Sequence, residues 1–129
     1  MSKRRILIID DERHYRDSVR LLLSVYEELE IIEAVEGTEG VEMAKVLKPD
    51  LVILDNKMPK TPGELTAKLF RSDPLLRTIP IIMMTGMRLS ESEASLIKLD
   101  VDEYVLKPCH PDQLVSIIEK YIGPLKQRG

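Results

Sequence analysis

Residues 51–55 read Leu51-Val52-Ile53-Leu54-Asp55, four consecutive apolar residues followed by one carboxylate. A short apolar run of this kind is typical of a β-strand that is covered on both faces. Similar runs occupy residues 6–9, 31–35, 81–84 and 104–106. The pattern therefore predicts five short buried strands.

Between these runs the apolar residues follow a helical spacing. Helices are expected at about residues 19–26, 41–47, 63–70, 89–97 and 111–122. We expect Thr38 to cap the second helix, Pro111 to begin the last helix and Gly123 to end it. Because one helix lies in each interval, the strands are predicted to be parallel, with helices on both faces of one sheet.

Composition narrows the class of protein. The chain has 129 residues, which fits one domain, and its 43% hydrophobic content excludes disorder as the main state. A formal charge of −3 gives no general support for binding nucleic acid or anionic membranes. With one cysteine, no signal peptide pattern and no membrane-spanning run, the sequence predicts a cytoplasmic protein.

Polar side chains follow four of the five predicted strands, and these are Asp10, Asp11, Asp55, Thr85 and Lys107. The carboxyl ends of parallel strands meet at one edge of a sheet, so we expect these side chains to converge. Crowded carboxylates repel one another unless a cation lies between them, and Mg²⁺ prefers oxygen ligands. Together with an ammonium and a hydroxyl, such carboxylates can bind a phosphoryl group, and one of them can accept it as an aspartyl phosphate.

Each of these residues alone also has an ordinary interpretation. An aspartate after a strand is commonly a turn residue or a helix cap, and a lysine is commonly a solvated surface charge. Only their joint arrangement favours phosphoryl chemistry. His14 is a possible metal ligand and Cys109 a possible redox-sensitive thiol, but a solvated helix residue and a small packing residue are the simpler interpretations.

Four segments in this order resemble the receiver domain of bacterial two-component response regulators, and the single-domain chemotaxis type is closest in size. They are residues 8–12 (Ile-Ile-Asp-Asp-Glu), 49–55 with 58–59 and 63, 83–86 (Met-Met-Thr-Gly) and 104–108 (Tyr-Val-Leu-Lys-Pro). The resemblance implies a flavodoxin-like (βα)5 α/β fold, doubly wound around a five-stranded parallel sheet of order 2-1-3-4-5. We expect the receiver domain to cover residues 1–124 and a short, loose C-terminal tail to cover residues 125–129.

The resemblance also implies a role for each site residue. Asp55 matches the residue that accepts a phosphoryl group from a sensor histidine kinase or a phosphotransfer protein. Asp10 and Asp11 match the acidic pair that binds Mg²⁺, together with Asp55 and the backbone carbonyl of Lys57.

The remaining matches concern the response to phosphorylation. Thr85 matches a hydroxyl that turns toward the phosphate, and Lys107 matches an ammonium that pairs with a phosphate oxygen. Tyr104 matches an aromatic residue that changes rotamer when the threonine moves. The Lys107-Pro108 bond is expected to be cis, and Met87 is expected to border the phosphate and slow its loss.

The predicted function is a phosphorylation-activated signalling switch. It is not an enzyme with a separate substrate, although it would catalyse its own phosphorylation and dephosphorylation. A downstream protein would bind the fourth helix, fifth strand and fifth helix, at about residues 88–122. The alternative is an excised receiver domain of a longer regulator with a DNA-binding or enzymatic output domain. We expect a monomer or a phosphorylation-dependent dimer, without direct nucleic-acid binding or membrane insertion.

Two other function classes fit the residues less well. A Mg²⁺-dependent hydrolase with an aspartyl nucleophile usually has a second carboxylate two residues later, where this chain has Lys57. A binding module that has lost phosphorylation would not be expected to keep the complete set of site residues. One departure from the family is Asp100, at a position where glycine with positive φ is common, which predicts a differently shaped end of the fourth helix.

Overall fold

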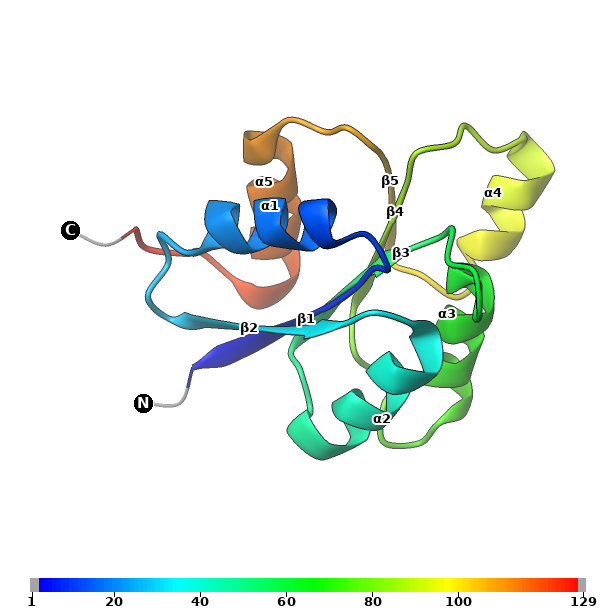
Figure 1. The fold of residues 1–129 in the computed structure, drawn as a ribbon, viewed down its shortest axis with the longest axis horizontal. Coiled ribbons are helices and arrows are strands. Elements are labelled where there is room, and N and C mark those ends of the chain that lie inside the picture. Colours follow the sequence, from blue (N-terminus) through cyan, green and yellow to red (C-terminus); the bar gives the residue numbers. More distant parts are fainter. Residues whose placement is uncertain (1–2, 128–129) are drawn as a thin grey trace.

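Five parallel strands form one sheet in the order β2-β1-β3-β4-β5, in agreement with the prediction (Figure 1). The structure is a computed structural model that describes residues 3–127. The strands are β1 (Arg4–Ile9), β2 (Leu29–Ala34), β3 (Leu51–Asp55), β4 (Ile81–Thr85) and β5 (Glu103–Leu106). The helices are α1 (Arg13–Leu23), α2 (Gly37–Leu47), α3 (Gly63–Ser72), α4 (Glu91–Ile97) and α5 (Pro111–Ile122).

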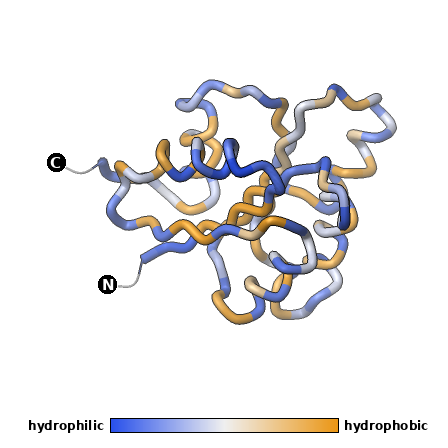
Figure 2. Tube along the Cα trace, in the orientation of Figure 1, coloured by the Kyte–Doolittle hydropathy of each residue, from blue (hydrophilic) through white to orange (hydrophobic). Residues whose placement is uncertain are grey.

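The sheet separates two hydrophobic cores, which explains why its strands are apolar without alternation. Along β1, Leu7 and Ile9 belong to the core shared with α2, α3 and α4. Ile6 and Ile8 belong to the core shared with α1 and α5. Figure 2 shows the hydrophobic colour gathered in the central strands, whereas α1 is mostly hydrophilic. The fold is therefore the doubly wound arrangement that the apolar runs predict.

The strand register brings the polar residues together at the carboxyl ends of the strands. Ile9 is paired with Leu54, so Asp10 and Asp55 follow side by side. Thr85, the last residue of β4, is paired with Leu106, so Lys107 comes next at the same edge. The site is thus assembled by the ends of β1, β3, β4 and β5, while β2 lies at the sheet edge and contributes none of the predicted site residues.

One predicted helix cap is wrong. The residue that caps α2 is Glu36 rather than Thr38, because the Glu36 carboxylate accepts a hydrogen bond from the N–H of Glu39 at 2.9 Å. A side chain at Gly37, the first residue of α2, would collide with Thr66 of α3. Glycine therefore allows the start of α2 to pack closely against α3.

The expected boundaries of α5 are confirmed. Pro111 is its first residue, and Gly123 ends it with a positive φ of 90°. The ring of His110 caps the helix by accepting a hydrogen bond from the N–H of Asp112 at 3.1 Å. Among residues 3–127, no helix is long and apolar enough to cross a lipid bilayer.

One further expectation, the loose C-terminal tail, needs correction. Residues 125–127 are not loose: the N–H of Leu125 donates to Glu119 at 2.7 Å, and Gln127 forms an antiparallel bridge with Tyr26. The last two residues of the predicted tail lie outside the described part of the chain. Asp100, which stands where glycine is common in the family, does not have positive φ, and its carboxylate accepts a hydrogen bond from Lys68 at 2.8 Å.

Candidate functional site

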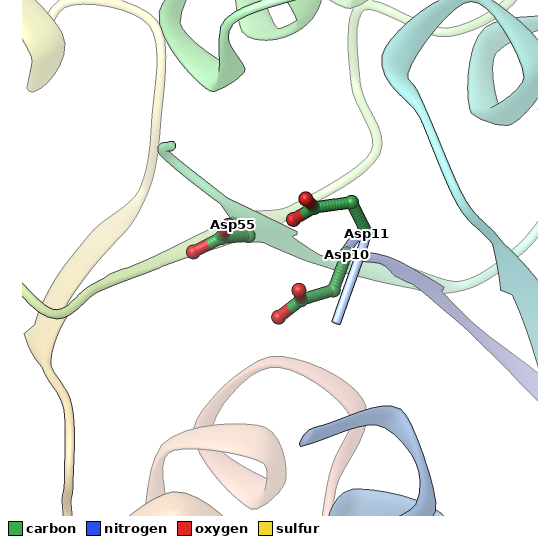
Figure 3. Close-up of side chains that lie close together, drawn as sticks. All are labelled: Asp10, Asp11 and Asp55. Carbon is green, nitrogen blue, oxygen red and sulfur yellow. The ribbon is translucent and has the colours of Figure 1, made fainter. Parts of the chain in front are cut away.

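Three carboxylates meet at the carboxyl ends of β1 and β3, and Figure 3 shows them gathered there. Asp10, Asp11 and Asp55 each offer one oxygen atom, and these atoms lie within 4.8 Å of one another. Asp10 is 1% exposed and Asp55 is 7% exposed, whereas Asp11 faces solvent. Two largely buried anions are therefore held close together beside a third, and a cation is needed to offset their repulsion.

Lys107 supplies such a cation. Its Nζ donates to Asp10 Oδ2 at 2.9 Å and to Asp55 Oδ1 at 3.1 Å. Lys107 is held in place by its own N–H, which donates to the carbonyl of Thr85 at 2.7 Å. The Lys107-Pro108 bond is cis, as expected. One ammonium thus links the ends of β1, β3 and β5.

The charges of the site shift the pKa values of its members. Burial, reinforced by the negative charge of Asp10, raises the pKa of Asp55, although Lys107 opposes the change. Burial alone would lower the pKa of Lys107, but its hydrogen bond and charge interaction with Asp10 outweigh this and raise it. The lysine is therefore firmly cationic, while Asp55 ionises less readily than an exposed aspartate.

The backbone around Asp55 is fixed by α3. The N–H of Gly63 donates to the carbonyl of Asn56 at 2.9 Å. A Cβ at residue 63 would lie only 2.3 Å from the carbonyl oxygen of Asp55, so only glycine allows this close approach. The first turn of α3 is thereby held against the end of β3.

Asp10 is held by a second set of contacts, from Glu12 just before α1 and from Arg16 on α1. Its carboxylate accepts a hydrogen bond from the N–H of Glu12 at 2.9 Å, and its carbonyl accepts one from Arg16 at 2.8 Å. Arg16 also pairs with Glu33 at 3.0 Å, and Glu33 pairs with Arg20 at 2.6 Å. These ion pairs connect α1 to β2 and orient the arginine that bonds to Asp10.

Replacing Glu33 with glutamine is expected to lower the free energy of unfolding by about 1 kcal/mol at pH 7. Burial raises the pKa of Glu33, but hydrogen bonds from Arg20 and Arg16 outweigh it, so the net pKa is lowered. The ionised pair therefore stabilises the fold above pH 4.5, the ordinary value, and loses this contribution as the pH falls through the lower folded-state pKa.

Urea unfolding at pH 7 and near pH 3 measures this effect. The difference in the free energy of unfolding between the Glu33→Gln variant and wild type should shrink at the lower pH, because Glu33 itself then approaches neutrality. Glu42→Gln is the matched control, since Glu42 pairs with Lys45 at 3.3 Å but is 72% exposed. An equal loss of stability at both pH values would contradict the ion-pair explanation.

Thr85 at the end of β4 and Tyr104 within β5 are not hydrogen-bonded to the carboxylates. The fully buried Thr85 hydroxyl accepts a hydrogen bond from the N–H of Met87 at 3.2 Å. The Tyr104 hydroxyl donates to the carbonyl of Met87, also at 3.2 Å. Both side chains that the family resemblance assigned to switching are thus bonded to one peptide segment of the β4–α4 loop.

The carboxylates open into a cleft between loops at the sheet edge. Its lining residues are Asp11, Glu12, Asp55, Lys57, Met58, Pro59, Gly86, Met87 and Lys107. Lys57 and Met87 both line this cleft together with Asp55. The lifetime of a phosphate in this cleft stays a prediction.

The sequence matches the response regulator receiver domain over residues 6–119. The chain belongs to this family. Receiver domains are phosphoacceptors of two-component systems and bind Mg²⁺ in an acidic pocket, and the three clustered carboxylates of this receiver domain are consistent with such a pocket. The expected family and its flavodoxin-like fold are thereby confirmed.

Known proteins similar to this receiver domain include regulators and kinases. It is 34% identical to the phosphate regulon transcriptional regulatory protein PhoB of Pseudomonas aeruginosa, over 86% of this chain and 48% of that protein. It is 32% identical to a solved receiver domain from Methanoculleus marisnigri, with a TM-score of 0.74 over 93% of this chain and 97% of that one.

A third solved structure, of the same fold, contains a magnesium ion. The receiver domain of a Pseudomonas aeruginosa sensor histidine kinase, solved with magnesium coordinated in its active-site cleft, has a TM-score of 0.83. It covers 95% of this chain and 100% of that one at 21% identity, which shows a shared fold. The chain spans about half the length of the curated relatives it matches.

Sequence reasoning missed Tyr15 of this receiver domain. The Nζ atom of Lys107 lies 3.8 Å from the centre of the Tyr15 ring, and the Tyr15 hydroxyl donates to Met84 Sδ at 2.8 Å. Burial, with the charges of Cys109, Asp10 and Asp55, raises the pKa of Tyr15, so the ring stays neutral. Tyr15 is four residues before the buried Val19, so extending the helical stripe by one turn would have placed it on the inner face of α1.

The simpler interpretations of His14 and Cys109 agree with the structure. His14 lies in the first turn of α1 and is exposed, and it is not part of the carboxylate group. Cys109 packs against the core shared with α1 and α5, and burial raises the pKa of its thiol. A raised pKa reduces the thiolate fraction, which argues against a reactive cysteine.

Proposed function

We propose that this receiver domain is a phosphorylation-activated switch in which Asp55 accepts a phosphoryl group from a sensor histidine kinase or a phosphotransfer protein. The observation that carries the proposal is the placement of Asp55. Its carboxylate opens into the cleft, 3.1 Å from the Lys107 ammonium and in one group with Asp10 and Asp11. A carboxylate that is accessible from the cleft and next to a cation can act as the nucleophile.

In the proposed transfer, one Oδ atom of Asp55 attacks the phosphorus of a phosphohistidine. The new P–O bond forms as the P–N bond breaks, and the donor histidine keeps the electron pair of the broken bond and takes up a proton. Lys107 lies where it can move from the Asp55 carboxylate to an oxygen of the transferred group, because its Nζ already contacts Asp55. Positioning and charge neutralisation are the main requirements of phosphoryl transfer.

The donor set fits Mg²⁺. Asp10, Asp11 and Asp55 offer only carboxylate oxygens, within 4.8 Å of one another, and hard divalent cations prefer such ligands. We assign the backbone carbonyl of Lys57 as a further ligand, by resemblance to the family. When bound, the cation would neutralise the carboxylates and the phosphoryl oxygens. The related kinase receiver domain crystallised with magnesium supports the assignment.

The switch would use the β4–α4 loop. Thr85 would exchange its hydrogen bond with Met87 for one with the phosphate, and Tyr104 would follow because it bonds to the same residue. This response shifts the balance between two states of the domain. Leu96, Leu99 and Leu106 are exposed on or beside α4 and β5, which supports a downstream protein partner at the α4–β5–α5 face.

Two ways of passing on the signal are proposed, one for a single-domain protein and one for a longer regulator. A single-domain protein would signal by contact with a partner in the cytoplasm, as a monomer or as a phosphorylation-dependent dimer. The matched relatives are about twice as long as this chain, and one is a transcriptional regulator, so a longer regulator with an attached output domain is the second candidate.

Incubation with acetyl phosphate and Mg²⁺, followed by intact mass measurement, tests the proposed function. We expect a gain of one phosphoryl group, which EDTA prevents and hydroxylamine removes, because acyl phosphates react with hydroxylamine. Reduction of the acyl phosphate with borohydride and peptide mapping should then place the modification on Asp55. The absence of any adduct on the folded protein would refute phosphoacceptor function.

A further inference from the structure

Tyr15 is in direct contact with the cation of the site. The face of its ring lies 3.8 Å from the Lys107 Nζ, well inside the range of about 6 Å over which a cation and an aromatic ring attract. The Lys107 side chain is only 16% exposed, so little water weakens this attraction. The Tyr15 hydroxyl donates to Met84 Sδ on β4, which orients the ring.

The three neighbours of the Lys107 ammonium differ in what phosphoryl transfer does to them. When Asp55 becomes an acyl phosphate, its negative charge moves from the carboxylate to the phosphoryl oxygens, and Asp10 must share its charge with any bound divalent cation. The Tyr15 ring keeps its charge distribution throughout, and its raised pKa keeps it neutral. The ring is therefore the constant neighbour of an ammonium whose other partners change.

We propose that Tyr15 is a positioning residue: its ring holds the Lys107 ammonium beside Asp55 while the carboxylates exchange partners during phosphoryl transfer. The inference rests on the proposed phosphoacceptor function for its effect on rate, but the contact itself can be tested without phosphorylation. A leucine at position 15 would keep an apolar side chain against the core shared with α1 and α5, but it would leave the ammonium without an aromatic face.

The contact is tested first by NMR on the metal-free wild-type protein with labelled lysine. The Lys107 methylene protons next to Nζ, assigned with a Lys107→Arg variant, should be shifted upfield by the ring and show cross-peaks to the Tyr15 ring protons. Tyr15→Phe should keep the upfield shift, and Tyr15→Leu should remove it. A Lys107 signal that coincides with those of the exposed lysines in wild type would overturn the proposal.

The effect on rate is tested with acetyl phosphate. Tyr15→Leu is expected to slow adduct formation about fivefold to twentyfold, the value of a largely desolvated cation–π contact, whereas Tyr15→Phe stays within about twofold. In a Lys107→Met background, Tyr15→Leu should cause less than about a twofold further change, because its effect acts through the lysine.

Three results would overturn the positioning role: equal rates for wild type and Tyr15→Leu, equal slowing by phenylalanine and leucine, or a full additional loss in the Lys107→Met background. A failure of the proposed function is distinct from these, because wild type itself would then form no adduct while the NMR contact persists. If Tyr15→Leu does not fold, the wild-type and Tyr15→Phe spectra still decide whether the ring holds the lysine.

Discussion

Replacing Asp55 with asparagine is expected to abolish the phosphoryl adduct and also to stabilise the metal-free protein. An amide is not a nucleophile for phosphoryl transfer, so adduct formation should fall to background. Burial and the nearby Asp10 raise the pKa of Asp55, which means that the fold favours the neutral form of this side chain. A neutral side chain of the same shape should therefore raise the melting temperature at pH 7 in EDTA, by about 3–5 °C for each 1 kcal/mol gained.

The pH dependence of this stabilisation has a definite sign. Because the folded pKa of Asp55 is raised, its ionisation destabilises the fold above that pKa, and the penalty disappears as the pH falls toward the ordinary value of 3.8. The difference in melting temperature between Asp55→Asn and wild type should therefore be smaller at pH 4 than at pH 7. Calorimetry at pH 7 and pH 4 measures it.

Asp17→Asn is the matched control for Asp55→Asn. Asp17 is 60% exposed on α1 and lies 3.7 Å from Arg13, so its replacement should change neither the adduct nor the melting temperature appreciably. A lower melting temperature for Asp55→Asn than for wild type at pH 7 in EDTA would show that the lost contact with Lys107 outweighs the relieved repulsion.

Of the substitutions proposed here, Lys107→Met is expected to lower the stability of the metal-free protein most. The substitution keeps much of the side-chain volume but removes the ammonium that bonds to Asp10 and Asp55. Removing one partner of a buried ion pair costs about 3–5 kcal/mol, because the remaining charge is left uncompensated. The melting temperature in EDTA should fall by roughly 10 °C or more, and differential scanning calorimetry measures the change.

Lys68→Met is the control for this variant, because Lys68 also pairs with a carboxylate, Asp100, at 2.8 Å. Its side chain is 60% exposed, so we expect a loss of at most about 1 kcal/mol. Added Mg²⁺ should recover more stability in Lys107→Met than in wild type, because the cation then replaces the missing ammonium. Equal losses for the two methionine variants would contradict a central role for Lys107 in balancing the acidic group.

The order of elements and the location of the site could be predicted from the sequence. Apolar runs without alternation indicate strands buried on both faces, and helical spacing between them requires parallel crossovers. Parallel strands end at one edge, so residues directly after them must lie near one another. Asp10, Asp55 and Lys107 are predicted to converge for this reason, and the structure places Lys107 within hydrogen-bonding distance of both carboxylates.

The errors concern contacts that depend on how elements pack. Glu36 replaces Thr38 as the cap of α2, where Gly37 packs tightly against α3. Residues 125–127 are held by Glu119 of α5 and by Tyr26, which is distant in the sequence. The packing of Gly37 against Thr66 and of Gln127 against Tyr26 is not visible in local sequence, since the partner in each case belongs to a distant segment.

The sequence by itself determined the family, the sheet and the set of charged groups at its edge, because strand periodicity and strand ends are local properties of the chain. Only the tertiary structure decided what surrounds those groups. The contact of the Tyr15 ring with Lys107 depends on how α1 packs against the sheet. The hydrogen bonds that Thr85 and Tyr104 form with Met87 depend in the same way on the β4–α4 loop. Packing of this kind is set by many distant side chains at once, so no single stretch of sequence specifies it.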